Sequence, residues 1–176
     1  GQALVVFAHL PDHEAVPGPV PAPAAFGRLT LLVNNAGEFE PDDIETLSHA
    51  RFQRAIAVNF EAPLFLSQAF AAQAPEGVDA SIVNILDQRV LRPNPRFFSY
   101  TLSKSALFTA TTTLAQALAP RIRVNGVAPG PTLPSPRQTD AQFAAQADSM
   151  PLRRGPQPDD IATAVLYLVQ ATSVTG

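Results

Sequence analysis

The sequence predicts an α/β fold built on a doubly wound parallel sheet. Short apolar runs alternate with longer amphipathic segments along the 176 residues, and this pattern is typical of repeated strand–helix–strand units. The chain is 46% hydrophobic and 15% charged, with a formal net charge of -3. That composition indicates one domain with a sizeable core and excludes a disordered acidic chain.

Each element follows from its local pattern. Strands are predicted where four apolar runs occur, at residues 3–8, 29–33, 81–86 and 122–127. Helices are predicted at residues 51–73, 99–118 and 161–170. Pro63 is expected to kink the first helix, or to lie where a neighbouring helix absorbs the bend. Pro158 and two following acids suit the start of the last helix.

Composition also excludes several kinds of function. The chain has no cysteine, so disulfides and thiolate metal sites are excluded and no metal is expected. The longest basic cluster is Arg153-Arg154, which offers no stripe for nucleic acid. Purely apolar runs stay far below the ~18 residues of a spanning helix. We therefore expect a cytoplasmic protein with neither membrane nor nucleic acid as a partner.

Tyr100 and Lys104 stand four residues apart in a predicted helix, so their side chains share one face. A free phenol has a pKa near ~10, and a neighbouring ammonium is expected to lower the pKa of Tyr100. Lowering it by ~3 units takes ~4 kcal/mol, which a close, partly desolvated cation can supply. The pair is thus a candidate general acid, although the same spacing also occurs on exposed helix surfaces. Lys104 is the only lysine in the chain, which favours a special role.

Four ordered segments resemble the short-chain dehydrogenase/reductase family. They are Asn34-Asn35-Ala36-Gly37 after a strand, Val58-Asn59-Phe60 in the next helix, Tyr100 with Lys104, and Pro129-Gly130 after the strand at 122–127. Residues 154–162 and 174–176 match the family's last helix and the approach to its final strand. The resemblance covers residues 1–176. It implies a Rossmann-like three-layer α/β/α fold, NADP(H) as cofactor, a small-molecule substrate, and a homotetramer or homodimer.

The resemblance also implies roles for individual residues. Tyr100 would protonate the substrate, Lys104 would hold the nicotinamide ribose, and Asn59 would hold a water between Lys104 and solvent. The expected cofactor-binding residues are Asn35, Ala36, Gly37, Ile85, Tyr100, Lys104, Pro129, Gly130 and Thr132. The expected substrate-binding residues are Phe39, Asp87, Arg96, Phe97 and Leu133. Structural alternatives stay open: Asn59 could fill a helix irregularity, Pro129-Gly130 could be an ordinary turn, and Arg96 and Phe97 could serve packing.

Asp87 departs from the family pattern, because most members carry a serine thirteen residues before the tyrosine. An ionised carboxylate would repel the negative charge that develops on a ketone oxygen, but it can relay a proton to an imine nitrogen. The exchange is similar to that in pteridine reductases, and so is Phe39, whose ring could stack on a pterin. We expect reduction of a ring C=N in a dihydropterin or dihydrofolate. Asp87 could instead only cap the following turn.

The phosphate-binding turn is missing, because no Gly-x-Gly-x-x-Gly follows any strand. The family's first βαβ unit would precede Gly1 and its last strand would follow Gly176, so one partial domain, residues 1–176, incomplete at both ends, is expected. His9 stands where the family usually has an acid near the adenine, and the prolines of residues 16–23 exclude a helix there. The chain is then either a portion of a longer protein or a degenerate copy.

Two functional alternatives remain from the sequence. One is a carbonyl reductase or alcohol dehydrogenase of the same family, in which Asp87 is incidental. The other is a non-catalytic remnant without the phosphate turn, which acts only through association. The residues that would choose between NADP and NAD are expected outside the printed sequence. The identity of the substrate depends on the shape of the predicted loop at 133–152, which the sequence does not give.

Overall fold

A computed structural model describes residues 28–176, and its centre is a parallel sheet. The strands are β1 (Leu31–Asn34), β2 (Ala80–Ile85) and β3 (Ile122–Val127), hydrogen-bonded in the order β1-β2-β3. Val33 pairs with Val83, and Val83 pairs with Asn125. Three of the predicted strands are thereby confirmed. The predicted strand at 3–8, the proline-rich stretch at 16–23 and His9 lie outside the described residues.

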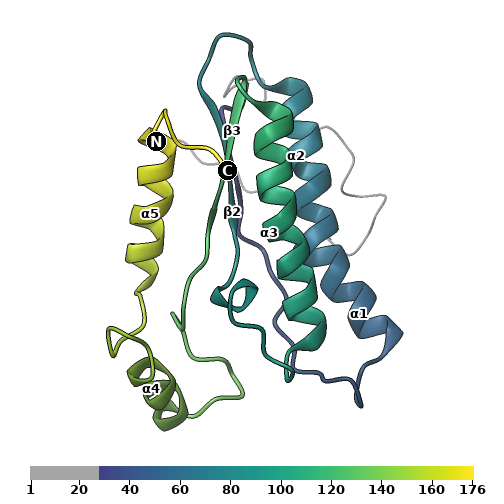
Figure 1. Cartoon of the computed structure of the whole chain (residues 1–176), viewed down its shortest axis with the longest axis vertical. Coiled ribbons are helices and arrows are strands. Elements are labelled where there is room, and N and C mark those ends of the chain that lie inside the picture. The colour runs from purple at the N-terminus through teal and green to yellow at the C-terminus, as the bar shows by residue number, and fades with distance from the viewer. Residues whose placement is uncertain (1–27) are drawn as a thin grey trace.

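Helices cover both faces of the sheet (Figure 1). On one face lie α1 (His49–Ile56), a π-helical segment η1 (Ala57–Glu61), α2 (Ala62–Gln73) and α3 (Phe98–Leu118). On the other face lies α5 (Pro158–Gln170), which contacts β2 and β3. The described residues therefore form the three layers of a Rossmann-like fold, with each connection between strands crossing on the α2 and α3 side.

The core lies between the sheet and the α2–α3 layer. Phe70 of α2 and Ala115 of α3 pack against the apolar side chains of Ile82, Ile122 and Val124. All five side chains are almost fully buried, and each large one contributes about 1.5–3 kcal/mol relative to exposure. This packing holds α3, and with it Tyr100, against the carboxyl ends of the strands.

Pro63 lies in the first turn of α2, directly after the π-helical segment η1. Proline has no amide hydrogen for the carbonyl one turn earlier, and one wider π-helical turn is the local adjustment that the chain makes. The irregularity expected at Pro63 is thus displaced by a few residues. It places Asn59 at the centre of η1, fully buried.

The segment after β3 contains a helix that the sequence patterns did not predict. α4 (Asp140–Asp148) lies inside the predicted loop at 133–152, and Thr139 starts it in a capping box with Gln142. A second short element, the 3₁₀ turn η2 (Gln88–Val90), follows β2. Both η2 and the segment leading to α4 lie beyond the carboxyl ends of the strands (Figure 1).

Gly155, in the segment between α4 and α5, packs its backbone against that of Pro131, in the segment after β3. A Cβ at this position would lie 1.8 Å from the carbonyl oxygen of Pro131. Only glycine allows the two backbones to approach this closely. The contact explains why a glycine stands shortly before the proline that opens α5.

The continuous helical stretch His49–Gln73 is long and apolar enough to cross a membrane by length and composition. No other helix among residues 28–176 meets that test. The stretch packs on β1 and α3, and a core helix of a globular domain passes the same test. Its position in the fold accounts for its apolar composition.

Candidate active site

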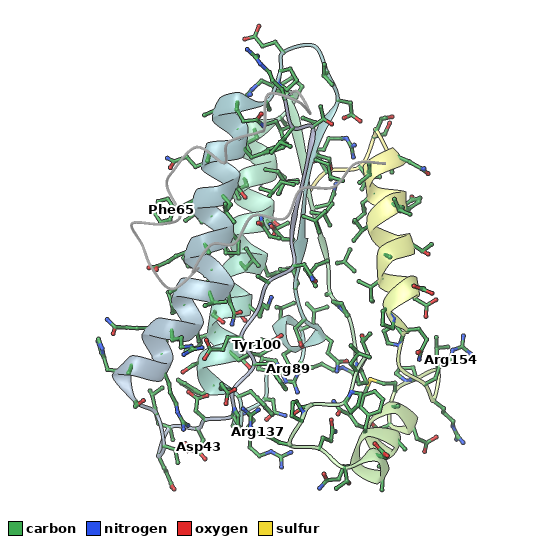
Figure 2. All side chains as sticks on the ribbon, turned by 180° about the vertical axis from the view of Figure 1, so that it is seen from behind. Asp43, Phe65, Arg89, Tyr100, Arg137 and Arg154 are labelled. Atoms are coloured by element: carbon green, nitrogen blue, oxygen red, sulfur yellow. The ribbon has the colours of Figure 1, made fainter. Side chains whose placement is uncertain are left out.

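The candidate site is a cleft at the carboxyl ends of the three strands. Its volume is about 940 Å³, and its walls come from the segment after β1, from η2, from the start of α3 and from the segment that leads to α4. Tyr100, Arg89 and Arg137 lie together at this end of the molecule (Figure 2). Ligand sites of open parallel sheets form at this edge, so the position agrees with the one expected from the sequence.

Tyr100 and Asp87 meet directly in this cleft. The Tyr100 hydroxyl donates a hydrogen bond of 2.9 Å to Oδ2 of Asp87. Oδ1 of Asp87 accepts from the backbone N–H of Arg89 at 2.8 Å and thereby caps η2. Asp87 therefore does both things that were treated as alternatives: it caps the following turn and contacts the candidate acid.

The pKa of Tyr100 shifts opposite to the direction expected from Lys104. Burial raises the pKa of Tyr100 well above its ordinary value, and the negative charge of Asp87 and the hydrogen bond to it raise it further. Arg89 opposes the shift. The expectation that Lys104 lowers the pKa of Tyr100 is thus wrong for this structure, because burial of the phenol and then the carboxylate of Asp87 determine the direction of the shift. Tyr100 is a protonated donor at neutral pH.

Lys104 lies one turn along α3 and points past the Tyr100 ring, with Nζ 6.0 Å from the ring centroid. Nζ donates to the carbonyl oxygen of Ile85 at 2.8 Å. The side chain is 4% exposed, and burial lowers the pKa of Lys104 to about 8 although Asp87 acts in the opposite direction. Ile85, predicted as a cofactor residue, thus positions the lysine through its backbone.

Asn59 uses its whole carboxamide to hold the segment after β1. Oδ1 accepts from the Glu38 amide at 2.8 Å, while Nδ2 donates to the Glu38 carbonyl and to Ser103 Oγ, each at 3.0 Å. No hydrogen bond joins Asn59 to Lys104 within residues 28–176. The structure thus gives Asn59 a positioning role, and its predicted contact with a water stays a prediction.

The predicted cofactor residues form one exposed rim beside Lys104. Asn35, Ala36 and Gly37 are exposed, and a Cβ on Gly37 would lie 3.4 Å from Asn59 Oδ1 and 3.8 Å from Lys104 Nζ. A flat cofactor ring and its ribose can therefore approach the lysine across this backbone. The described residues fit the nicotinamide half of a dinucleotide.

The opposite rim comes from the turn after β3. Pro129 accepts a hydrogen bond at its carbonyl oxygen from the Gln88 amide, and Thr132 Oγ1 donates to the carbonyl of Gly130. Gly130, Thr132 and Leu133 line the cleft. These predicted residues are thus brought to the same cleft as Tyr100. The bond from Gln88 ties η2 to this turn.

An aromatic cluster forms the substrate side of the cleft. The rings of Phe39 and Phe97 stack at 4.3 Å between centroids with 7° between their planes. Phe39 also meets the Tyr100 ring edge-on at 4.8 Å. Arg96 lines the same cleft and is exposed. The predicted substrate residues Phe39, Asp87, Arg96, Phe97 and Leu133 therefore share one cavity.

Two functional groups were missed from the sequence. Arg89 packs its guanidinium 4.9 Å from the centroid of Phe39 and 4.8 Å from that of Phe97, beside Asp87. Asp42 accepts from the amide of Ser99 at 3.0 Å and from its hydroxyl, which fixes the first turn of α3. The spacing of Asp87 and Arg89, two residues apart in a turn, was the sequence signal that could have predicted the position of Arg89. Asp42 had no local signal, because its partner is 57 residues away.

Comparisons with known proteins agree with this geometry. A family profile described as "Enoyl-(Acyl carrier protein) reductase" matches residues 21–176, and the chain belongs to the short-chain dehydrogenase/reductase family. FolM alternative dihydrofolate reductase 1 from Brucella suis, solved in complex with NADP, is 45% identical with a TM-score of 0.88. That match covers 94% of this chain and 67% of the other.

Other relatives carry different names. The angucycline C-6 ketoreductase LanV, solved with bound NADP, is 28% identical with a TM-score of 0.87, over 99% of this chain and 72% of the other. "Glucose and ribitol dehydrogenase" of Daucus carota is 34% identical over 85% of this chain and 52% of its own length. The chain spans about half the length of the first curated relatives it matches.

Proposed function

We propose that this chain carries the reacting centre of an NADP(H)-dependent reductase that reduces a ring C=N of a dihydropterin or dihydrofolate. The observation that carries the proposal is the 2.9 Å hydrogen bond from Tyr100 to Asp87. It couples a protonated phenol to a carboxylate where most of the family has a serine hydroxyl. The name and bound NADP of the Brucella suis relative support both the substrate class and the cofactor.

The protein's own residues would manage the proton. The nicotinamide would supply the hydride to the ring carbon. Asp87 accepts the Tyr100 proton in its hydrogen bond and can pass it to the ring nitrogen, so that the phenol and the carboxyl act as one donor unit. The net change is one hydride and one proton added across the C=N bond. Lys104, held by Ile85, keeps a cation beside the phenol as its proton leaves.

The aromatic cluster supports a flat substrate. Phe39 stacks on Phe97 and meets Tyr100 in a T-shaped contact, and stacking of a heteroaromatic on such a cluster contributes about 0.5–1.5 kcal/mol beyond burial. Gly37 leaves the opposite side open for the nicotinamide. A flat ring between these two surfaces would place its C=N bond at Asp87.

The proposal is tested by NADPH oxidation with 7,8-dihydrobiopterin. Turnover is expected in the wild-type protein, and a loss of at least about 100-fold in Tyr100→Phe, the range of a positioned general acid. Arg28→Gln, an exposed change outside the cleft, serves as the matched control. Absence of dihydropterin turnover in a folded protein that binds NADPH would refute the proposal.

A second candidate is a carbonyl reductase of the same family. The names of the ketoreductase and sugar dehydrogenase relatives favour it. Robust ketone reduction without dihydropterin turnover would select it. The hydrogen bond from Tyr100 to Asp87 argues against it, because an ionised carboxylate beside the acid would repel the negative charge that develops on a ketone oxygen.

We also propose self-association as a homotetramer or homodimer. Phe65 on α2 and Leu102 and Phe108 on α3 are large apolar side chains that remain more than two-fifths exposed. Burying such a face against a second copy would remove it from water. Light scattering coupled to size-exclusion chromatography measures the assembly directly.

A further inference from the structure

Among the three arginines that line the cleft, Arg89 is the one whose side chain is not exposed. Its side chain is 13% exposed, although it lies on a three-residue turn at the mouth of the cleft. Burying a guanidinium carries a large desolvation cost unless its donors are satisfied. Its surroundings show what offsets that cost and what does not.

Two kinds of contact hold Arg89 in place. Nη1 lies 3.4 Å and 3.3 Å from the two oxygens of Asp87. The guanidinium carbon also lies within 5 Å of the centroids of Phe39 and Phe97 and 6.0 Å from that of Tyr100. Long contacts to a carboxylate and a position over aromatic rings stabilise the charge, but they leave the planar fork of donors only partly used.

The remaining donors of Arg89 have no partner. Nε is buried and makes no hydrogen bond, and Nη2 makes none with any residue between 28 and 176. An unpaired buried donor costs about 1–3 kcal/mol. Nε is too deeply buried for a ligand to reach, so Nη2 is the donor that a ligand acceptor in the cleft can bind, beside the reacting carboxylate.

We propose that Arg89 is a specificity-determining residue that donates hydrogen bonds to the ring carbonyl oxygen of a flat heterocyclic substrate, such as a dihydropterin. The proposal rests on the proposed function and adds a contact to it. Asp87 and Tyr100 transfer the proton, while Arg89 binds the carbonyl of the cyclic amide and orients the ring so that its C=N bond lies at Asp87. A ring without that acceptor would leave the donors unpaired, and sites of this kind discriminate strongly.

The test compares two ligands that differ only at this edge. 6,7-Dimethylpterin carries a ring carbonyl where 2,4-diamino-6,7-dimethylpteridine carries an amino donor. Binding of each to the protein with NADP is followed by pterin fluorescence, which is unobstructed because the chain has no tryptophan. The preference, the ratio of the two dissociation constants, is measured in wild type, Arg89→Lys and Arg89→Met.

Arg89→Lys keeps the charge beside Asp87 and removes the planar fork. We expect it to reduce the preference for the oxo ligand at least about tenfold relative to wild type, and Arg89→Met to do the same. Arg92→Gln is the matched control: it removes an exposed arginine three residues along the same segment, outside the cleft lining. Its preference should equal that of wild type.

Equal weakening of both ligands, or an unchanged preference in the Arg89 variants, would overturn the proposal, since Arg89 would then only support Asp87 and the rings. The same proteins are assayed for NADPH oxidation with 6,7-dimethyl-7,8-dihydropterin. An Arg89-dependent preference without turnover would refute the reaction and uphold the recognition. Failure of both pteridines to bind the wild-type protein with NADP would overturn both.

Discussion

Replacing Lys104 with methionine is expected to stabilise the fold at neutral pH. Burial lowers the pKa of Lys104 from 10.5 to about 8, so the folded chain holds an ammonium at a cost of about 3 kcal/mol, at about 1.4 kcal/mol per pH unit. Methionine removes that cost with a side chain of similar length. It also removes the hydrogen bond to Ile85, a loss of about 1 kcal/mol. The expected net gain at pH 7 is about 2 kcal/mol.

The pH dependence identifies the cause. The pKa of Lys104 is lower in the folded than in the unfolded chain, so the unfolded state binds more protons between about pH 8 and pH 10.5. Wild-type stability therefore rises with pH through that window as far as Lys104 is concerned. Lys104→Met lacks this contribution. Its advantage over wild type should shrink as the pH rises and turn into a deficit of less than about 1 kcal/mol by pH 10.5, where mainly the lost hydrogen bond to Ile85 remains.

Urea unfolding at pH 7, 9 and 10.5 measures the difference. Arg121→Met is the matched control, because Arg121 is an exposed cation with one hydrogen bond, to the Ala71 carbonyl. The control should change stability by a similar small amount at each pH. A stability difference between Lys104→Met and wild type that does not vary with pH would refute the account of the buried ammonium.

Three further outcomes are expected. The variant Tyr167→Phe leaves Tyr100 as the single tyrosine. Its native tyrosinate absorbance should appear only well above pH 10, because burial and Asp87 raise the pKa of Tyr100. Ionisation near pH 10 would contradict that shift. Arg123→Met should destabilise the chain by about 3 kcal/mol in urea unfolding. The reason is that the buried guanidinium of Arg123 binds Asp79 and caps the last carbonyls of α5. A loss as small as that of Arg121→Met would show that this helix cap is dispensable. Gly155→Ala should lower the stability of the fold by about 1–3 kcal/mol, because its Cβ would clash with the Pro131 carbonyl. Gly130→Ala, whose Cβ would meet Gln88 at 3.6 Å, should lower it less. Equal losses of stability would refute the close approach at Gly155.

The regular elements were predictable because local patterns determine them. The strand expected at 122–127 matches β3 residue for residue, and the helix expected at 99–118 matches α3 within one residue. Both are buried elements with continuous apolar patterns. α4 was missed because it buries no residue in the described structure. Its signal was the capping pair Thr139 and Gln142, which needs no apolar stripe.

The site was predictable in its residues but not in its electrostatics. Tyr100, Lys104 and Asp87 come together as expected, because fixed spacings on α3 and at the end of β2 place them there. The predicted direction of the Tyr100 pKa shift was wrong, since it depends on how deeply folding buries the phenol and on the carboxylate placed beside it. Arg89 was missed because its role depends on contacts made only after folding: its partner Phe39 lies 50 residues away in the sequence.

The central claim is that Asp87 directs the Tyr100 proton to a ring nitrogen. Asp87→Ser restores the residue that most of the family carries at this position, and it can be assayed with 7,8-dihydrobiopterin and with a simple aromatic ketone, both with NADPH. The account predicts that kcat with the dihydropterin falls at least about 100-fold while ketone reduction is retained or increases. Dihydropterin turnover at the wild-type rate in Asp87→Ser would contradict it.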